Sequence, residues 1–186
     1  MSPPTPAQTP ADLAHLLDWI GRSETLHDTV GPTPVVAMQA TLDYPATAVA
    51  AGSALPYLWH WLYFLPSYRT SEAGEDGHPT RGGFMPPVPL PRRMWAGSQL
   101  QFHHPVRVGD VLQRQSSIAE VTVKDGRSGR LVFVKVKHEL HASGASGADH
   151  ASGPAITEFQ DIVYRDAKRP GDVDPAPTAA PTGAPW

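Results

Sequence analysis

The sequence predicts an α+β fold in which a curved antiparallel sheet packs on one buried helix. Three observations favour this class: apolar residues at helical spacing occur before residue 45, alternating strand patterns fill much of residues 99 to 166, and these strands keep one polar face. A block of helices followed by a block of long strands is the usual order of an α+β domain.

Two helices are expected in the first quarter of the chain. Thr9 and Pro10 form an N-cap and a first helical residue, and Gly21 provides the stop. The apolar stripe of this helix is Leu13, Leu16, Leu17 and Ile20. Thr33 and Pro34 repeat the start signal, and the second helix is apolar enough to be largely buried. Its stripe is Val35, Met38 and Leu42.

The strands are predicted from period-two alternation. Residues 23–30 form a short strand, residues 111–123 a long one that ends at hairpin signals in KDGRSGR, and residues 156–166 a closing strand. In SQLQFHHPVRVGD one face carries Leu100, Phe102, His104, Val106 and Val108. In LVFVKVKHEL one face carries Val132, Val134, Val136, His138 and Leu140. Both faces are suited to covering a core.

The chain is expected to form a single domain over residues 10–167. Residues 1–9 and 168–186 are rich in proline and poor in groups to bury, so both are predicted to be disordered tails. Residues 142–153, which are rich in Gly, Ser and Ala, predict a surface loop because strand-like sequence resumes after them.

Composition excludes several classes of function. Fifteen Lys and Arg against 18 Asp and Glu give a net charge of -3, which argues against nucleic acid or an anionic membrane as a partner. The absence of cysteine excludes disulfides, thiolate metal sites and a cysteine nucleophile. With no secretory signal and no apolar run of roughly 18 residues, a cytoplasmic protein is expected.

Motifs for common catalytic chemistry are missing. There is no G-x-S-x-G turn for a serine nucleophile and no glycine pattern for a dinucleotide or a P-loop. His103 and His104 are adjacent on a predicted strand and point to opposite faces, so they form no local chelate. H-E-x-x-H is absent as well, and neither a metal ion nor a cofactor is expected.

Two aromatic segments are candidates for ligand binding. In RRMWAG, Arg92 and Arg93 stand beside Trp95 immediately before a predicted strand, where guanidinium groups grip phosphate and an indole stacks on a purine. A solvated arginine pair beside a packed tryptophan explains this segment equally well. In LPYLWHWLYFLP, an extended chain would place Trp59 and Trp61 on one face. The residues by themselves favour an aromatic core patch or a dimer interface there.

Two histidines lie on apolar strand faces. His104 and His138 each alternate with aliphatic residues in the predicted strands. This placement favours buried structural histidines over functional ones.

The segments LPYLWHWLYFLP, GGFMPPVPLPRRMWAGSQLQFHHPVRVGD and GRSGRLVFVKVKHEL closely resemble the N-terminal half of the mesaconyl/itaconyl-CoA hydratases. These belong to the MaoC-like double hot-dog superfamily, and the resemblance runs from about Trp19 to Tyr164. It implies a hot-dog fold, an antiparallel sheet wrapped around a central helix, and pairing of two such halves. It also implies reversible addition of water to an enoyl-CoA, with the CoA thioester as substrate.

The resemblance also implies roles for the candidate residues. Trp59 and Trp61 would form a wall of an acyl-CoA tunnel, and the RRMWAG segment, with Arg92, Arg93 and Trp95, the edge of its nucleotide end. His104 completes the predicted substrate-binding set. The loop from residue 68 to residue 83, with Glu72, Glu75, Asp76 and His78, would be a flexible cover.

The chain departs from the family at the catalytic signature, an Asp and a His about five residues apart around the start of the hot-dog helix. Pro32 and Val36 stand at those positions, and neither can activate water. No catalytic residue is therefore assigned. The expected protein is a non-catalytic hot-dog subunit that binds an enoyl-CoA or 3-hydroxyacyl-CoA and needs a catalytic hot-dog partner.

Two alternatives remain open. One is a homodimeric acyl-CoA-binding protein without hydratase activity. The other is a self-sufficient enzyme that uses a histidine such as His27 or His104.

Overall fold

The computed structural model describes residues 10–45, 47–74, 76–126, 129–144 and 152–167. The predicted tails, residues 1–9 and 168–186, and most of the predicted surface loop at residues 142–153 lie outside these ranges. Among the described residues, no helix is long and apolar enough to cross a membrane.

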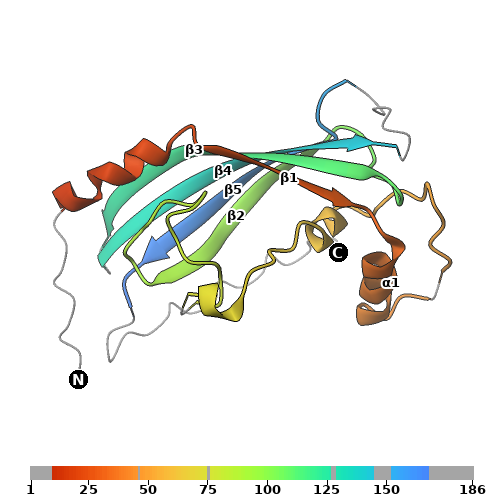
Figure 1. Cartoon of the computed structure of the whole chain (residues 1–186), viewed down its shortest axis with the longest axis horizontal. Helices are drawn as coiled ribbons and strands as arrows, with labels where there is room; N and C mark the ends of the chain where they lie inside the picture. Colours follow the sequence, from red (N-terminus) through yellow and green to blue (C-terminus); the bar gives the residue numbers. More distant parts are fainter. Residues whose placement is uncertain (1–9, 46, 75, 127–128, 145–151, 168–186) are drawn as a thin grey trace, which may run out of the picture.

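One antiparallel sheet dominates the molecule (Figure 1). Its strand order is β1-β3-β4-β5-β2, and every pair of neighbours is antiparallel. The strands are β1 (Ser23–Thr29), β2 (Arg92–Phe102), β3 (Val111–Gly126), β4 (Gly129–Ser143) and β5 (Ile156–Arg165). The long strands twist and curve together in Figure 1, which confirms the predicted α+β class with a curved antiparallel sheet.

Apolar and polar residues alternate along β4, and the apolar ones lie on the inner face of the sheet. Val132, Val134, Val136 and Leu140 are buried in turn, as the sequence predicts, and their partners on β3 and β5 come into register with them. Directly opposite residues of antiparallel strands share one face, so this single pattern aligns the apolar residues of three strands.

The helices differ from the prediction in what they bury. The first, η1 (Pro10–Trp19), is a 3₁₀ helix that packs Leu13 and Leu16 against β3. The second, α1 (Pro32–Thr41), was expected to be largely buried, but Val35 is its one buried residue. Figure 1 places α1 at one end of the sheet.

The irregular chain between α1 and β2 takes the place expected for a buried helix. Tyr63, Val88 and Leu90 from this chain are buried against the inner face of the sheet. Leu42 of the second predicted helical stripe remains about half exposed, and so does the neighbouring Val36.

Two local conformations also differ from the prediction. The tryptophan segment is not extended: residues Trp59–Leu62 form a 3₁₀ turn, η2, which begins after Leu58 in a left-handed conformation at φ 73°. Strand β2 begins at Arg92, so RRMWAG is part of the strand, and it ends at Phe102, before His104. A further short turn, η3, spans Thr70–Glu72.

The inner face carries two apolar clusters. The first contains Leu13, Leu16, Ile118 and Val136, and the second contains Leu112, Leu140 and Ile156 together with other residues. On β3, β4 and β5 the residues that lie between the two clusters are polar. The candidate functional site lies at this break in the apolar face.

Candidate functional site

A row of polar side chains crosses four neighbouring strands of the sheet. Glu24 of β1 pairs with Ser116 of β3, Ser116 pairs with His138 of β4, and His138 pairs with Glu158 of β5. We call these four residues the polar row. Because directly paired residues point to the same face, the register alone brings the four side chains together.

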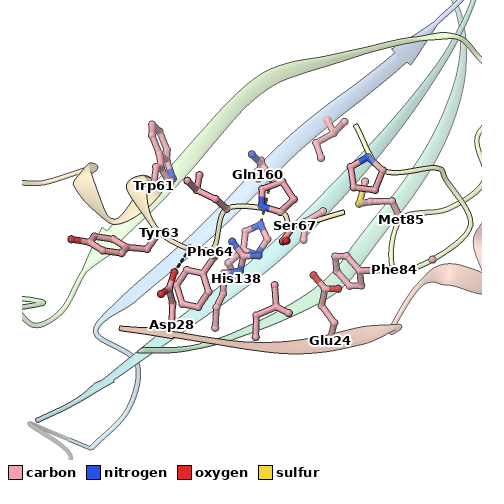
Figure 2. A pocket seen from close by; sticks show the side chains of 18 of the residues that line it. Glu24, Asp28, Trp61, Tyr63, Phe64, Ser67, Phe84, Met85, His138 and Gln160 are labelled. Carbon is pink, nitrogen blue, oxygen red and sulfur yellow. Dashed lines mark hydrogen bonds between the residues drawn. The ribbon is translucent and has the colours of Figure 1, made fainter. Parts of the chain in front are cut away.

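A cavity of about 980 Å³ lies over the polar row. Its floor is the sheet, and its other walls are chain segments from residues 60–68 and 79–85. In Figure 2, Glu24 and Asp28 approach from β1, Phe64 from the segment after η2, and Phe84 and Met85 from the far side of the cavity. A cavity of this size is typical of a small-molecule site.

Glu158 is a buried carboxylate held by three side chains. Ser98 Oγ donates a hydrogen bond to Oε1 at 2.6 Å, Trp61 Nε1 donates to Oε2 at 3.1 Å, and His60 Nε2 lies 3.7 Å from Oε2. Burial raises the pKa of Glu158, but His60, Ser98 and Trp61 outweigh that effect and lower it to about 2. Glu158 is therefore ionised at neutral pH and does not act as a proton donor there.

His138 contributes a buried imidazole to the polar row. Its Nδ1 lies 2.8 Å from Ser116 Oγ, and its Nε2 lies 3.5 Å from Gln160 Oε1. Burial lowers the pKa of His138, and the charge of Arg114 lowers it further. These partners suit a ring that accepts at Nδ1 from the serine hydroxyl and carries its proton on Nε2.

Arg114 and Glu24 are charged residues that face the cavity. Arg114 Cζ lies 4.7 Å from the centroid of the Phe64 ring. Burial lowers the pKa of Arg114, and the charges of Glu24 and Glu158 oppose that shift. Burial likewise raises the pKa of Glu24, and Arg114 opposes it.

Asp28 fixes the wall that carries Phe64. Its Oδ2 accepts a hydrogen bond from the Phe64 backbone N–H at 2.6 Å, and its Oδ1 accepts from Thr29 N–H at 2.7 Å. Phe64 has φ 58°, a left-handed conformation that needs such support in a residue with a side chain. Tyr63 adds a second tie, because its hydroxyl donates to Gly31 O at 2.6 Å.

Three of the predicted binding residues lie at or next to the cavity. Trp61 and Arg93 line it. Trp95 lies beside Trp61, with its ring 6.1 Å from that of Trp61 in an edge-to-face contact and its Nε1 3.2 Å from Ser98 Oγ. Trp95 is 60% exposed, so its indole remains available to a ligand.

The other three predicted residues lie elsewhere. Trp59 packs against the second apolar cluster and does not share a face with Trp61, because the 3₁₀ turn separates the two indoles. Arg92 is paired in register with Arg165 and is not among the residues that line the cavity. His104 lines a second pocket, of about 480 Å³, together with Tyr57.

His60 lies between the two pockets. Its ring is buried and lines both of them, and neither ring nitrogen has a hydrogen-bond partner among the described residues. Within the described ranges, no group of three or more His, Asp or Glu is arranged to hold a metal ion.

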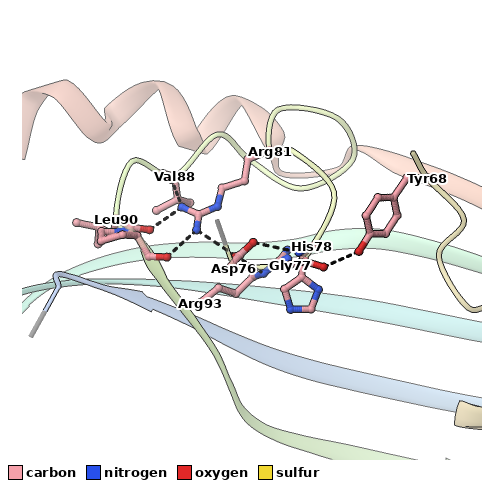
Figure 3. Close-up of polar contacts among 9 residues, drawn as sticks. Tyr68, Asp76, Gly77, His78, Arg81, Val88, Leu90 and Arg93 are labelled. Carbon is pink, nitrogen blue, oxygen red and sulfur yellow. Dashed lines mark hydrogen bonds and ion pairs between the residues drawn. The ribbon is translucent and has the colours of Figure 1, made fainter. Parts of the chain in front are cut away.

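The loop predicted as a cover borders the cavity through residues such as Tyr68, Thr80 and Arg81. Figure 3 shows the polar contacts that Arg81 and Asp76 make within this loop. Arg81 donates hydrogen bonds to the backbone carbonyls of Val88, Leu90 and Pro91 at 2.6, 2.5 and 2.9 Å. Asp76 Oδ2 lies 3.4 Å from both Arg81 Nη2 and Arg93 Nε. Glu75, which was expected in this cover, lies outside the described residues.

Replacing Arg81 with methionine is expected to release this loop. Three backbone carbonyls would lose a charged donor, so the free energy of unfolding should fall by about 2 kcal/mol, and proteolytic cleavage between residues 68 and 83 should become faster. Urea unfolding and timed limited proteolysis would measure both effects. Arg69→Met, an exposed arginine in the same loop, is the control, and equal cleavage rates in the two variants would contradict the anchoring role of Arg81.

Several residues of the site were missed in the sequence. Glu158 and Gln160 interrupt the apolar face of β5, and Arg114 and Ser116 interrupt that of β3. On each of these strands, two polar residues at alternate positions stand between aliphatic residues of the same face, and this pattern is visible in the sequence. Reading the inner face of every strand, rather than of two, would have found them.

Residues 58–184 match the family model described as hydroxyacyl-thioester dehydratase type 2. Over 165 residues the chain is 46% identical to mesaconyl-C(4)-CoA hydratase of Chloroflexus aurantiacus, an alignment that covers 89% of this chain and 55% of that protein. The chain thus spans about half the length of this curated relative.

A solved structure provides a comparison of folds. The ChsH1-ChsH2 complex of Mycobacterium tuberculosis matches with a TM-score of 0.58 and 10% sequence identity, over 88% of this chain and 97% of that one. At this identity the similarity concerns the fold, and it agrees with the predicted hot-dog fold.

Proposed function

The chain belongs to the hydroxyacyl-thioester dehydratase type 2 family, and from this premise we propose that it is a hot-dog subunit that binds an enoyl-CoA or 3-hydroxyacyl-CoA for addition or removal of water. The observation that carries the proposal is the polar row under the cavity of about 980 Å³. An acyl chain can enter between the apolar walls of this cavity and contact the hydrogen-bonding side chains of the polar row.

The polar row supplies binding and orientation in this proposal. Reversible dehydration needs one group that takes the α-proton and one that protonates the departing hydroxyl. Glu158, with a pKa of about 2, stays ionised and holds Trp61 as a wall of the cavity. His138 accepts from Ser116 at Nδ1, so its one ring N–H, whose contact with Gln160 Oε1 is long at 3.5 Å, is the donor that a substrate oxygen would take.

We propose that the catalytic pair comes from a second hot-dog unit. At the positions of the family's Asp and His signature, this chain has Pro32 and Val36, and no residue of α1 lines the cavity. The length of the curated relative is compatible with a further unit of similar size. A catalytic hot-dog partner would complete both the site and the tunnel for the thioester.

Among the predicted binding residues, Trp61, Arg93 and Trp95 are proposed to contact the thioester. Trp61 and Arg93 line the cavity and Trp95 contacts Trp61, and an exposed indole and a guanidinium suit the nucleotide part of CoA. The CoA thioester is the substrate, and no resident cofactor is part of the proposal. Trp59, Arg92 and His104 would act only indirectly on this cavity.

The test is the loss of enoyl-thioester absorbance when the purified chain is mixed with mesaconyl-C4-CoA or crotonyl-CoA, together with the oligomeric mass and the affinity for each ester. We expect micromolar to millimolar binding without turnover by the isolated chain, and turnover after a catalytic hot-dog partner is added. Turnover by the isolated chain would contradict the need for a partner. Absence of binding to any ester would contradict the proposed function itself.

The same samples distinguish the main alternative. A stable homodimer that binds CoA esters, and that shows no preference for a catalytic hot-dog partner, would indicate an acyl-CoA-binding protein without hydratase activity.

A further inference from the structure

A second pocket, of about 480 Å³, shares His60 with the cavity over the polar row. Its other walls come from residues 54–57, which precede η2, from residues 102–106 at and after the end of β2, and from Ile156 at the start of β5. A pocket of this volume is large enough for a small molecule. The proposed function does not use it.

Most of the wall of this second pocket is apolar. Tyr57 packs on Phe102, with the two ring centroids 4.5 Å apart. Tyr57 is 75% exposed, so a ligand that covers its ring removes apolar surface from water. The aliphatic lining residues are Leu55, Pro56, Pro105, Val106 and Ile156. These walls suit a ligand with one ring or a short aliphatic chain.

The ionisable side chains of the pocket are three histidines and a tyrosine. Among the described residues that line it there is no Asp, Glu, Lys or Arg. His103 Nε2 lies 3.1 Å from Thr157 Oγ1, whereas the His104 ring has no hydrogen-bond partner in the described part of the chain. Imidazole N–H groups donate to carboxylates, and no acid of the lining would repel one. The polar part of the pocket therefore suits an anionic acceptor.

His60 is the buried histidine of this set. Its side chain is only 4% exposed, and both ring nitrogens are buried without a hydrogen-bond partner among the described residues. Nε2 lies 3.7 Å from Glu158 Oε2, which is too long for a hydrogen bond. A buried polar group without a partner is destabilising unless an acceptor reaches it. A protonated imidazole donates from both nitrogens, so His60 can lie between Glu158 and a second carboxylate.

We propose that the second pocket binds a small organic acid, with the carboxylate at His60 and His104 and the apolar body against Tyr57 and Phe102. The ligand class is a monocarboxylic acid, because the pocket offers donors from its histidines and apolar walls elsewhere. This site is separate from the cavity over the polar row, and it does not depend on the proposed function.

The test uses three small probes. Benzoate has the ring and the charge, benzamide has the same ring without the charge, and acetate has the charge without the ring. Calorimetric titration of the full chain should give at least roughly tenfold tighter binding of benzoate than of either other probe. Equal binding of benzoate and benzamide would overturn the proposal.

Substitution of the two histidines locates the carboxylate. His60→Phe and His104→Phe keep a ring and remove its nitrogens, so each should weaken benzoate binding by roughly tenfold and change benzamide binding by less than about threefold. Thermal melts report the folding of each variant. His104 is only partly buried, so His104→Phe tests the pocket even if His60→Phe does not fold. An unchanged benzoate affinity in either folded variant would contradict the proposal.

Two further variants are controls for position. His15→Phe changes an exposed histidine of η1 outside both pockets and should leave benzoate binding unchanged. Arg114 lines the cavity over the polar row and not the second pocket, so Arg114→Met should also leave benzoate binding unchanged. Loss of benzoate binding in Arg114→Met, with no loss in His104→Phe, would place the acid in the other cavity and overturn the proposal.

Discussion

Replacing Glu158 with glutamine is expected to lower the free energy of unfolding by about 3 kcal/mol at pH 7. The pKa of Glu158 is about 2 in the folded chain, against an ordinary value of 4.5, and each unit of that difference corresponds to about 1.4 kcal/mol. Glutamine keeps the size of the side chain but removes the charge that Ser98, Trp61 and His60 stabilise.

The pH dependence of this effect has a definite sign. Because folding lowers the pKa of Glu158, the stabilisation is fully present above about pH 4.5 and is lost as the pH falls towards 2. Urea unfolding of both proteins between pH 7 and pH 3 should therefore show a shrinking difference. Asp18→Asn, at an exposed aspartate of η1, is the control. A difference that stays constant with pH would show that the Glu158 carboxylate is not held in this way.

Replacing Leu16 with alanine is expected to cost about 2 to 4 kcal/mol of the free energy of unfolding. Leu16 is completely buried, and it joins η1 to Ile118, Val134 and their neighbours on the sheet. The family model begins only at residue 58. This prediction therefore tests whether the folding unit starts near residue 10, as the single domain predicted for residues 10–167 requires.

The adjacent residue provides a close control. Leu17 is 49% exposed in the same helix, and Leu17→Ala should cost less than about 1 kcal/mol. Circular dichroism during urea unfolding gives both values. If the two variants are equally stable, η1 does not contribute to the core of the domain.

Much of the sheet was predictable from local patterns. Alternation in LVFVKVKHEL placed Val132, Val134, Val136 and Leu140 on the buried face, and the structure agrees. Period-two alternation depends only on the geometry of a single strand, so no knowledge of its neighbours is needed. The start of η1 at Pro10 follows from an equally local signal.

The buried surface of a helix was less predictable. Val35, Met38 and Leu42 have helical spacing, yet only Val35 is buried. The spacing of apolar residues indicates that one face of a helix can be buried. Whether α1 or the irregular chain around Tyr63 covers the sheet depends on which of them reaches it. The extended conformation expected for Trp59 and Trp61 failed for a similar reason, since Leu58 turns the chain.

The sequence determines the α+β class and the strands, because these follow from patterns within short segments. The tertiary structure decides the candidate site. Glu24, Arg114, His138 and Glu158 are far apart along the chain, and they meet only through the register of four strands. Register is set jointly by all the paired strands, so the charge balance of the cavity cannot be read from any one of them.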